Sequence, residues 1–399
     1  MFVTKLVNNL KPANVAHIQK TLQLNHCIRS TLNVQNVRLL YSHASLGLDG
    51  FLQASQTTQR QLENMGDKFK EKMSDFIEKD NNAMVFTEDL KNMIYISQND
   101  NDIDLVVKMI KKFNQQNKEL RFGSFIFGPV VMRLFHHHNK ADLALECFKS
   151  PELDGFFDQI ISYQLLLDLL YENEKYNEVL ECFQFIKEKQ LEGVRYPKNV
   201  VVLTMAACYK LNNKESLDYA LKFWQELHDV GHIPMRRAIT FCAALAYNQG
   251  NPSVALEILS SSRNQSYTTV RNLKIASLVD IGRIENVIPI MKSVFAEDLP
   301  EGQVHTFNRE VIDKVKKGVA ELDMATVTEE FDRIERMLEK NGQIVDASIN
   351  DQLCQEIKGG MVNKKHFVPR YDKFEPRPNR NFRPRRFNNN QRPGLDELV

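Results

Sequence analysis

Residues Ala144–Phe148 read Ala-Leu-Glu-Cys-Phe, and short segments of the same pattern recur along the middle of the chain. The further copies are Val179–Phe183 (Val-Leu-Glu-Cys-Phe), Ala220–Trp224 (Ala-Leu-Lys-Phe-Trp) and Ala255–Leu259 (Ala-Leu-Glu-Ile-Leu), with weaker copies that begin at Val107 and Val287. The four strong copies follow one another at spacings of 35, 41 and 35 residues. A period of about 35 residues is typical of stacked helical hairpins, each of which needs its neighbours to bury its apolar face.

Each repeat is predicted to contain two helices. In the repeat around Val179, leucines lie at helical spacing within Ile161–Tyr171, a polar break follows at Glu172–Tyr176, and a second apolar stripe begins at Val179. We therefore predict an all-α protein, an α-solenoid of stacked helical hairpins, with repeats over 85–300 and capping helices over 301–342. The small residue that begins each strong copy is expected where the two helices of a hairpin approach most closely.

The residues before the repeats contain one more helical pattern. Leu62, Met65, Phe69, Met73 and Phe76 follow one another at steps of three and four, which predicts an amphipathic helix within 46–84 that packs on the first repeat.

The chain has 399 residues, of which 43% are apolar and 26% are charged, enough for a large core. Its apolar runs are too short or too interrupted to cross a bilayer, so no membrane insertion is expected.

The beginning of the chain is basic and contains no acidic residue before Asp49. Its cations are Lys5, Lys11, Lys20, Arg29 and Arg38. A basic, acid-free amphipathic leader is typical of a mitochondrial transit peptide, because the membrane potential draws positive charge inward. We predict a transit peptide over 1–45, cleaved between Arg38 and Ser45, and a location in the mitochondrial matrix. The alternative is a disordered basic segment without a targeting role.

The sequence contains no pattern typical of an enzyme or of a metal protein. Cys147 and Cys182 occupy equivalent places in successive repeats, which indicates buried thiols rather than metal ligands. The run His136–His138 lies at the end of a predicted helix, without a Cys or acidic partner at ligand spacing, and is interpreted as a solvated helix end. No clustered carboxylates, glycine-rich nucleotide loop or activated nucleophile is evident. We therefore expect no catalytic residue, no metal and no cofactor.

The end of the chain, 343–399, is predicted to be a disordered basic tail. Between Lys358 and Arg392 it has eleven Lys or Arg residues against two acids, with recurrent proline and interleaved aromatic residues. Basic groups attract a phosphate backbone, and aromatic rings and guanidinium planes stack on bases. The predicted RNA contacts here are Arg377, Arg380, Phe382, Arg383, Arg385, Arg386 and Phe387. The alternative is a tail that only increases solubility.

The repeats resemble the pentatricopeptide repeat family. The resemblance rests on the period, on Ser162-Tyr163 at the start of one hairpin and on the second-helix pattern, whereas the Trp-Leu-Gly-Tyr pattern of tetratricopeptide repeats is missing. Further segments resemble one mitochondrial member of the family, namely Phe122–Leu134, Gly155–Phe157, Ala207–Asn212, Arg236–Ala238 and Ala243–Gln249. This closer resemblance extends from about Phe86 to Gly342 and implies roles in mitochondrial RNA maturation and respiratory-chain function.

The resemblance also implies base-reading positions. Pentatricopeptide repeats read single-stranded RNA at one base per repeat, through a few side chains of each repeat. By the family's pattern, the fifth residue of each first helix faces the base. These residues include Asn92, Gln164, Thr240 and Asn272, whose polar side chains suit a base edge, and Pro129 and Met205, which do not.

Two functions follow as hypotheses from these features. The first is a mitochondrial protein that binds single-stranded RNA and supports transcript maturation, with a processing enzyme or other RNA-maturation proteins as partners. The second is a helical-repeat scaffold in mitochondria that binds proteins and has no direct sequence-specific RNA readout. The irregular base-reading positions favour the second hypothesis, and the basic tail favours the first.

Overall fold

The computed structural model describes residues 39–63, 65–79, 84–120, 125–296 and 305–357. Within these ranges the chain is built from successive helical hairpins, which confirms the predicted all-α solenoid. The hairpins are α5 (Thr87–Ile96) with α6 (Asp100–Leu120), α7 (Gly128–His137) with α8 (Ala141–Lys149), α9 (Ile160–Glu172) with α10 (Tyr176–Lys189), α11 (Lys198–Leu211) with α12 (Lys214–Asp229), α13 (Arg236–Asn248) with α14 (Pro252–Ser260), α15 (Thr268–Asp280) with α16 (Val287–Ala296), and α17 (Arg309–Leu322) with α18 (Ala325–Lys340).

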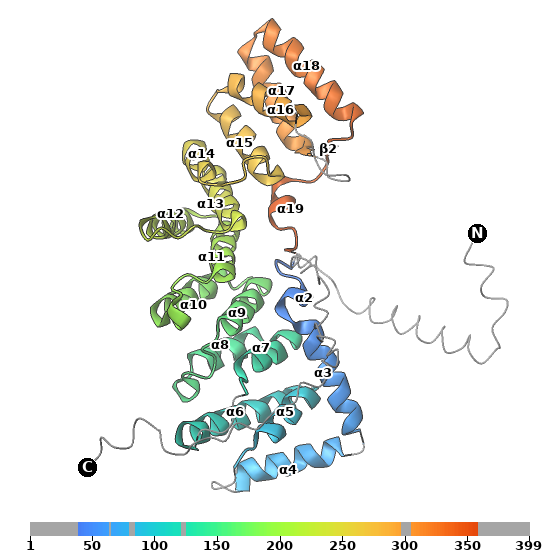
Figure 1. The fold of residues 1–399 in the computed structure, drawn as a ribbon, viewed down its shortest axis with the longest axis vertical. Coiled ribbons are helices and arrows are strands. Elements are labelled where there is room, and N and C mark those ends of the chain that lie inside the picture. Colours follow the sequence, from blue (N-terminus) through green and yellow to red (C-terminus); the bar gives the residue numbers. More distant parts are fainter. Residues whose placement is uncertain (1–38, 64, 80–83, 121–124, 297–304, 358–399) are drawn as a thin grey trace, which may run out of the picture. The chain divides into compact units, whose positions relative to one another are not determined.

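The first helices of the hairpins form a continuous layer. From α7 onward, each first helix contacts the first helix of the next hairpin, and the second helices α10, α12 and α14 each contact the first helix that follows them (Figure 1). The first helices are therefore surrounded by neighbours, and buried residues run without a break along Ser162–Tyr171 of α9 and Val200–Tyr209 of α11. Short 3-10 turns at Pro151–Leu153, Leu191–Gly193 and Ile284–Asn286 connect some of the helices.

The small residues of the repeated pattern are core residues, as predicted. The side chains of Ala144, Val179, Ala220 and Ala255 are all fully buried. Cys147 and Cys182, which lie three residues further along their helices, are buried free thiols. At the weaker first copy, Val106 is fully buried while Val107 is only partly buried, so the buried position there lies one residue earlier than the pattern indicated.

Ion pairs between adjacent hairpins reproduce the repeat period on the surface. Lysine side chains reach acidic side chains 31 to 40 residues away in sequence. Examples are Lys140–Asp100 (2.8 Å), Lys175–Asp142 (2.6 Å), Lys149–Glu181 (2.8 Å) and Lys187–Glu226 (2.9 Å). Lys189–Asp158 (2.8 Å) instead joins the end of α10 to the residues just before α9. Exposed pairs of this kind contribute little stability each, but they neutralise many cations that would otherwise attract an anionic ligand.

The N-terminal region differs from the single helix predicted before the repeats. It forms α2 (His43–Leu46), α3 (Leu48–Gln61) and α4 (Gly66–Lys79). The predicted apolar stripe is interrupted between α3 and α4, where Met65 is 62% exposed. Helix α3 contacts α5 and α7, and α4 contacts α6, so the region does pack on the first repeats.

The C-terminal region contains the two predicted helices, α17 and α18, and then more structure than the sequence indicated. Strand β2 (Ile344–Val345) pairs in parallel with β1 (Phe307–Asn308), and a short helix, α19 (Ile349–Leu353), follows. A reciprocal capping box between Ser348 and Asp351 begins α19. The prediction that the disordered tail begins at residue 343 is therefore wrong for residues 343–357. Residues 1–38 of the predicted leader (1–45) and residues 358–399 of the predicted tail (343–399) lie outside the described residues.

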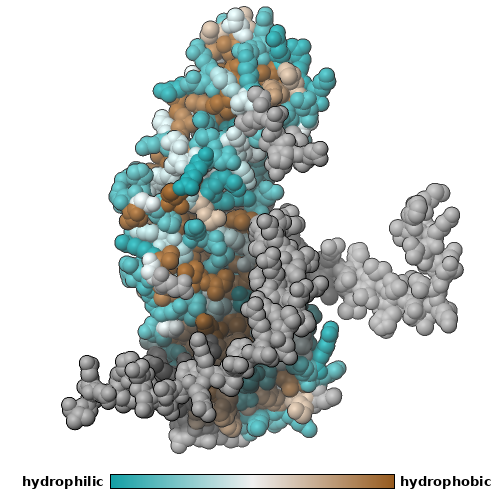
Figure 2. All heavy atoms as spheres, in the orientation of Figure 1, coloured by the Kyte–Doolittle hydropathy of each residue, from teal (hydrophilic) through white to brown (hydrophobic). Residues whose placement is uncertain are grey.

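No helix in the described part of the chain is long and apolar enough to span a membrane. On the face drawn in Figure 2, hydrophobic residues lie among hydrophilic ones rather than forming one uninterrupted apolar band.

Candidate nucleic-acid interface

Three of the four predicted base-reading residues are buried and bonded within the protein. Gln164 is 5% exposed and its Oε1 accepts a hydrogen bond of 2.9 Å from Asn199 Nδ2. Thr240 Oγ1 donates to the carbonyl oxygen of Arg237 at 3.0 Å. Asn272 is fully buried, and its Nδ2 donates to Asn308 Oδ1 at 2.7 Å. These amide and hydroxyl groups are therefore already occupied by protein partners.

The other fifth positions differ from these three. Asn92, in α5, is half-buried. Pro129, at the start of α7, is also half-buried, and Met205 of α11 is fully buried. Asn92 is thus the one predicted polar base-reading side chain with substantial exposure among the described residues.

The last described segment of the chain contributes to the burial of the predicted base-reading residues. We call residues 344–357 the return segment. Its helix α19 contacts α13 and α15, on the side of these helices opposite α12 and α14 (Figure 1). Arg237 of α13 donates to the carbonyl oxygens of Gln352 (2.9 Å), Leu353 (2.6 Å) and Gln355 (3.0 Å). The return segment therefore lies on the layer of first helices, over the positions that the family's pattern assigns to RNA.

Residues 39–46, which we call the N-terminal segment and most of which belong to the predicted leader (1–45), contact the same layer further along. Leu40 is fully buried, and its carbonyl oxygen accepts a hydrogen bond of 2.8 Å from the Ile357 amide. Tyr41 Oη donates to the Asn199 carbonyl oxygen at 3.4 Å, and Arg133 Nε of α7 donates to the Leu46 carbonyl oxygen at 2.9 Å. The N-terminal segment and the return segment thus meet on the layer of first helices.

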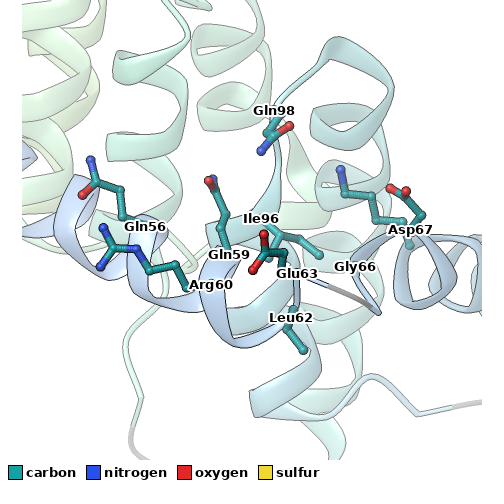
Figure 3. A pocket seen from close by; sticks show the side chains of 10 residues that line it. Gln56, Gln59, Arg60, Leu62, Glu63, Gly66, Asp67, Ile96 and Gln98 are labelled. Atoms are coloured by element: carbon teal, nitrogen blue, oxygen red, sulfur yellow. The ribbon is translucent and has the colours of Figure 1, made fainter. Parts of the chain in front are cut away.

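One pocket adjoins the return segment, and another lies in the N-terminal region. A pocket of about 330 Å³ lies where α11, α13, α15 and α17 meet the return segment, and its lining includes Tyr247, Lys314 and Asn350. A pocket of about 420 Å³ lies between α3, the start of α4 and the end of α5 (Figure 3). Its lining is mostly polar and includes Gln59, Arg60 and Gln98. Among the described residues, the predicted base-reading residues Asn92, Gln164, Thr240 and Asn272 line neither pocket.

The histidine run differs from the solvated helix end predicted from the sequence. His137 is exposed, but His136 is only 7% exposed, so the interpretation is wrong for His136. Its Nε2 lies 3.1 Å from Asp168 Oδ2 and 3.7 Å from Glu172 Oε2, both on α9. Spacing along the sequence concealed these acidic partners, because they come from the next hairpin. The detectable signal was Asp168 itself, a lone acid within the apolar run Leu165–Leu170.

The electrostatics of this cluster are governed by burial. Burial raises the pKa of Asp168 to about 8. Burial, together with the neighbouring Asp168 charge, raises the pKa of Glu172 to about 7. Burial also lowers the pKa of His136. Each pKa shift has the same cause, because removal from water disfavours the charged form of an ionisable group.

Comparison with known proteins tests the family resemblance inferred from the sequence. No family model matches the chain. The Mus musculus protein named "Pentatricopeptide repeat-containing protein 2, mitochondrial" is 32% identical over 274 residues, which cover 68% of this chain and 71% of the mouse protein. The Homo sapiens protein of the same name is 30% identical over 299 residues, which cover 72% of this chain and 76% of the human protein.

The chain belongs to the pentatricopeptide repeat-containing protein 2 family. This confirms the resemblance inferred from the repeats. Among solved structures, the maize pentatricopeptide repeat protein PPR10 matches with 13% identity and a TM-score of 0.39, covering 87% of this chain and 46% of the maize chain. The likeness to the named mouse and human proteins, at two thirds or more of their length, is what places the chain in the family.

Proposed function

We propose that this chain is an RNA-binding helical repeat protein of the mitochondrial matrix that supports transcript maturation and thereby respiratory-chain function. The observation that carries the proposal is membership of the pentatricopeptide repeat-containing protein 2 family, whose mouse and human members are named mitochondrial. Repeats of this class bind single-stranded RNA. The predicted basic leader (1–45), of which residues 1–38 lie outside the described residues, agrees with mitochondrial import.

The mode of binding proposed here does not depend on one base per repeat. Gln164, Thr240 and Asn272 are buried and engaged by protein partners, so each would have to exchange an internal hydrogen bond for one to a base. Many surface lysines of the repeats are paired with acids of the adjacent hairpin. We therefore assign most of the affinity to the basic tail, through Arg377, Arg380, Arg383, Arg385 and Arg386, with stacking by Phe382 and Phe387.

A role without catalysis fits this proposal. Among the described residues, the buried His136, Asp168 and Glu172 form the one group of three or more His, Cys, Asp or Glu side chains placed to hold a metal ion. Cleavage of a phosphodiester by metal ions needs a site that a scissile phosphate can enter. Asp168 is fully buried, which excludes a phosphate from its carboxylate in this conformation. We propose that any cutting of the bound RNA is done by a processing enzyme that acts as a partner.

One observation favours the alternative function, a protein-binding scaffold. The layer of first helices is covered by the return segment and the N-terminal segment, which occupy the place that RNA takes in the family's pattern. A scaffold would use other surfaces of the repeats and would need no free base-reading side chain.

Crosslinking of the protein to RNA in isolated mitochondria, followed by sequencing of the recovered RNA, tests the proposal. We expect mitochondrial transcripts to be enriched over an uncrosslinked sample. Binding of purified protein to labelled single-stranded RNA, followed by fluorescence anisotropy at low and moderate salt, provides the second measurement. Absence of RNA in both experiments, combined with stoichiometric capture of a mitochondrial protein, would favour the scaffold.

A further inference from the structure

A buried cluster of His136, Asp168 and Glu172 joins two adjacent hairpins. Asp168 and Glu172 are four residues apart on α9, so their carboxylates lie on the same face of the helix, one turn apart. His136 lies in the last turn of α7, the preceding first helix, which packs against α9. Stacking of the repeats therefore brings one imidazole against two carboxylates from the next hairpin.

The charges of the cluster are not balanced by a neighbouring cation. Among the described residues, neither Lys nor Arg forms an ion pair with Asp168 or Glu172. The Asp168 side chain is 0% exposed and the Glu172 side chain 13% exposed. The second oxygens of the two carboxylates, Asp168 Oδ1 and Glu172 Oε1, are buried and accept no hydrogen bond from any other described residue. The two carboxyl groups themselves lie close enough to share a hydrogen bond if one of them carries a proton. Unpaired carboxylates inside a protein are costly, so either protons or a cation must compensate them.

The donor atoms of the cluster are spaced like the ligands of a small divalent cation. One candidate ligand atom from each of the three residues lies within 4.8 Å of the other two. Metal–ligand distances of about 2.0–2.2 Å in a tetrahedral site correspond to ligand–ligand distances of roughly 3.4 Å. The distances from His136 Nε2 to Asp168 Oδ2 (3.1 Å) and to Glu172 Oε2 (3.7 Å) lie on either side of this value.

We propose that His136, Asp168 and Glu172 bind one divalent cation of the Zn²⁺ class. One imidazole nitrogen and two carboxylate oxygens are ligands that Zn²⁺ takes, whereas Mg²⁺ and Ca²⁺ favour sites built from oxygen alone with more ligands. The slight exposure of Glu172 leaves a side on which water completes the coordination. The ion fastens α7 to α9 and is structural, so the proposal stands independently of RNA binding.

The alternative occupant of the cluster is a proton. Burial raises the pKa values of both Asp168 and Glu172, so a proton shared between the two carboxyl groups would also reduce their charge. This arrangement would leave the protein indifferent to Zn²⁺. Metal binding and proton sharing are therefore distinguished by a direct titration.

The test uses the full-length purified protein, stripped with a chelator and then titrated with ZnCl₂. We expect about one tightly held Zn²⁺ per chain after gel filtration, measured by elemental analysis, and a higher melting temperature than in the stripped protein. His136→Gln and the double variant Asp168→Asn with Glu172→Gln should each lose that ion and the thermal shift. His137→Gln, which changes the adjacent exposed histidine, is the matched control and should retain both.

Two outcomes would overturn the proposal. The first is wild-type protein that retains no stoichiometric Zn²⁺ and shows no thermal shift, the result expected for a shared proton. The second is folded His136→Gln protein that binds Zn²⁺ as the wild type does. If the variants fail to fold by circular dichroism, Co²⁺ substitution in the wild type decides the question. Visible absorption bands typical of four- or five-coordinate Co²⁺ support the site, and a spectrum of hydrated Co²⁺ alone contradicts it.

Discussion

Arg237 of α13 donates a hydrogen bond of 2.6 Å to the carbonyl oxygen of Leu353, 116 residues further along the chain. The same guanidinium also binds the carbonyl oxygens of Gln352 and Gln355. Hydrogen bonds from Tyr209 to Asn350 and from Asn272 to Gln352 add to this attachment of the return segment to the layer of first helices. Sequence reasoning placed the end of ordered structure before this segment. The attachment changes which surface of the repeats is available to a ligand, and it leads to the first prediction.

Replacement of Arg237 with Ala should release the return segment. A hydrogen bond that involves a charged group contributes about 1.5–3 kcal/mol, and three carbonyl oxygens would be left without their donor. We expect hydrogen–deuterium exchange in residues 344–357 to accelerate and the free energy of unfolding to fall by at least about 1.5 kcal/mol. Arg283→Ala, which removes an exposed arginine, is the control for loss of charge. Unchanged exchange in 344–357 would show that the segment is held without Arg237, by its apolar contacts and its other hydrogen bonds.

Replacement of Ala220 with Phe should overpack the middle of the repeats. Ala220 is fully buried in α12, and overpacking of a core typically costs about 1–3 kcal/mol. Thermal unfolding followed by circular dichroism measures the effect. Lys222→Phe places the same ring at an exposed position of α12 and should change the melting temperature little. Equal melting temperatures of wild type and Ala220→Phe would contradict the packing role of the small residue.

Import and processing of the leader can be predicted more narrowly with the structure. Replacement of Lys5, Lys11, Lys20, Arg29 and Arg38 with Gln should leave a tagged protein in the cytosol, because import depends on positive charge. Leu40 is fully buried and bonded to Ile357, so cleavage should occur before Leu40 within the range predicted from the sequence. Mass spectrometry of the mature N-terminus measures this. A mature chain that begins after Leu40 would contradict it.

The basic tail should contribute charge and stacking separately to RNA affinity. Replacement of Arg377, Arg380, Arg383, Arg385 and Arg386 with Gln should weaken binding to all single-stranded RNAs and lower the salt slope by about 0.7 for each phosphate that is no longer neutralised. Phe382→Leu with Phe387→Leu should weaken binding by about 1–3 kcal/mol per base that was stacked, with little change of slope. Fluorescence anisotropy across a salt series separates the two effects. Wild-type affinity in both variants would indicate that the tail does not bind RNA.

Glu226 should make stability depend on pH in the acidic range. Burial alone would raise the pKa of Glu226, but hydrogen bonds from Tyr196 (2.6 Å) and Lys187 (2.9 Å) and the nearby Arg195 hold it below 4.5. A carboxylate with a lowered pKa in the folded state stabilises the protein above its unfolded pKa, and this stabilisation is lost as the pH falls through the folded pKa. Glu226→Gln should therefore be less stable than wild type at pH 7.

The difference between Glu226→Gln and wild type should shrink as the pH falls below the ordinary pKa of a glutamic acid, about 4.3, toward the lowered pKa of the folded-state carboxylate. Melting temperatures measured in steps from about pH 7 to the most acidic pH at which the protein still folds follow this change. Asp218→Asn alters an exposed acid of the same helix and serves as the control. A difference that stays constant over this range would contradict the role of the charge.

The local arrangement of this protein could be read from the sequence, since helical hairpins carry their own signals. The apolar stripes, the polar breaks between them and the small residues Ala144, Val179, Ala220 and Ala255 are properties of neighbouring positions, and each repeat packs mainly on the next. The family resemblance had the same basis, because it rests on patterns within single repeats.

Contacts between distant parts of the chain were decided only by the tertiary structure. The return segment is short, and its attachment depends on Arg237 and Leu40, neither of which lies near it in sequence. The burial of Gln164, Thr240 and Asn272 follows from the packing of the first helices against one another and against these segments. The cluster of His136, Asp168 and Glu172 arises because hairpin stacking superimposes positions 32 and 36 residues apart, a distance at which sequence spacing contains no information on ligand geometry.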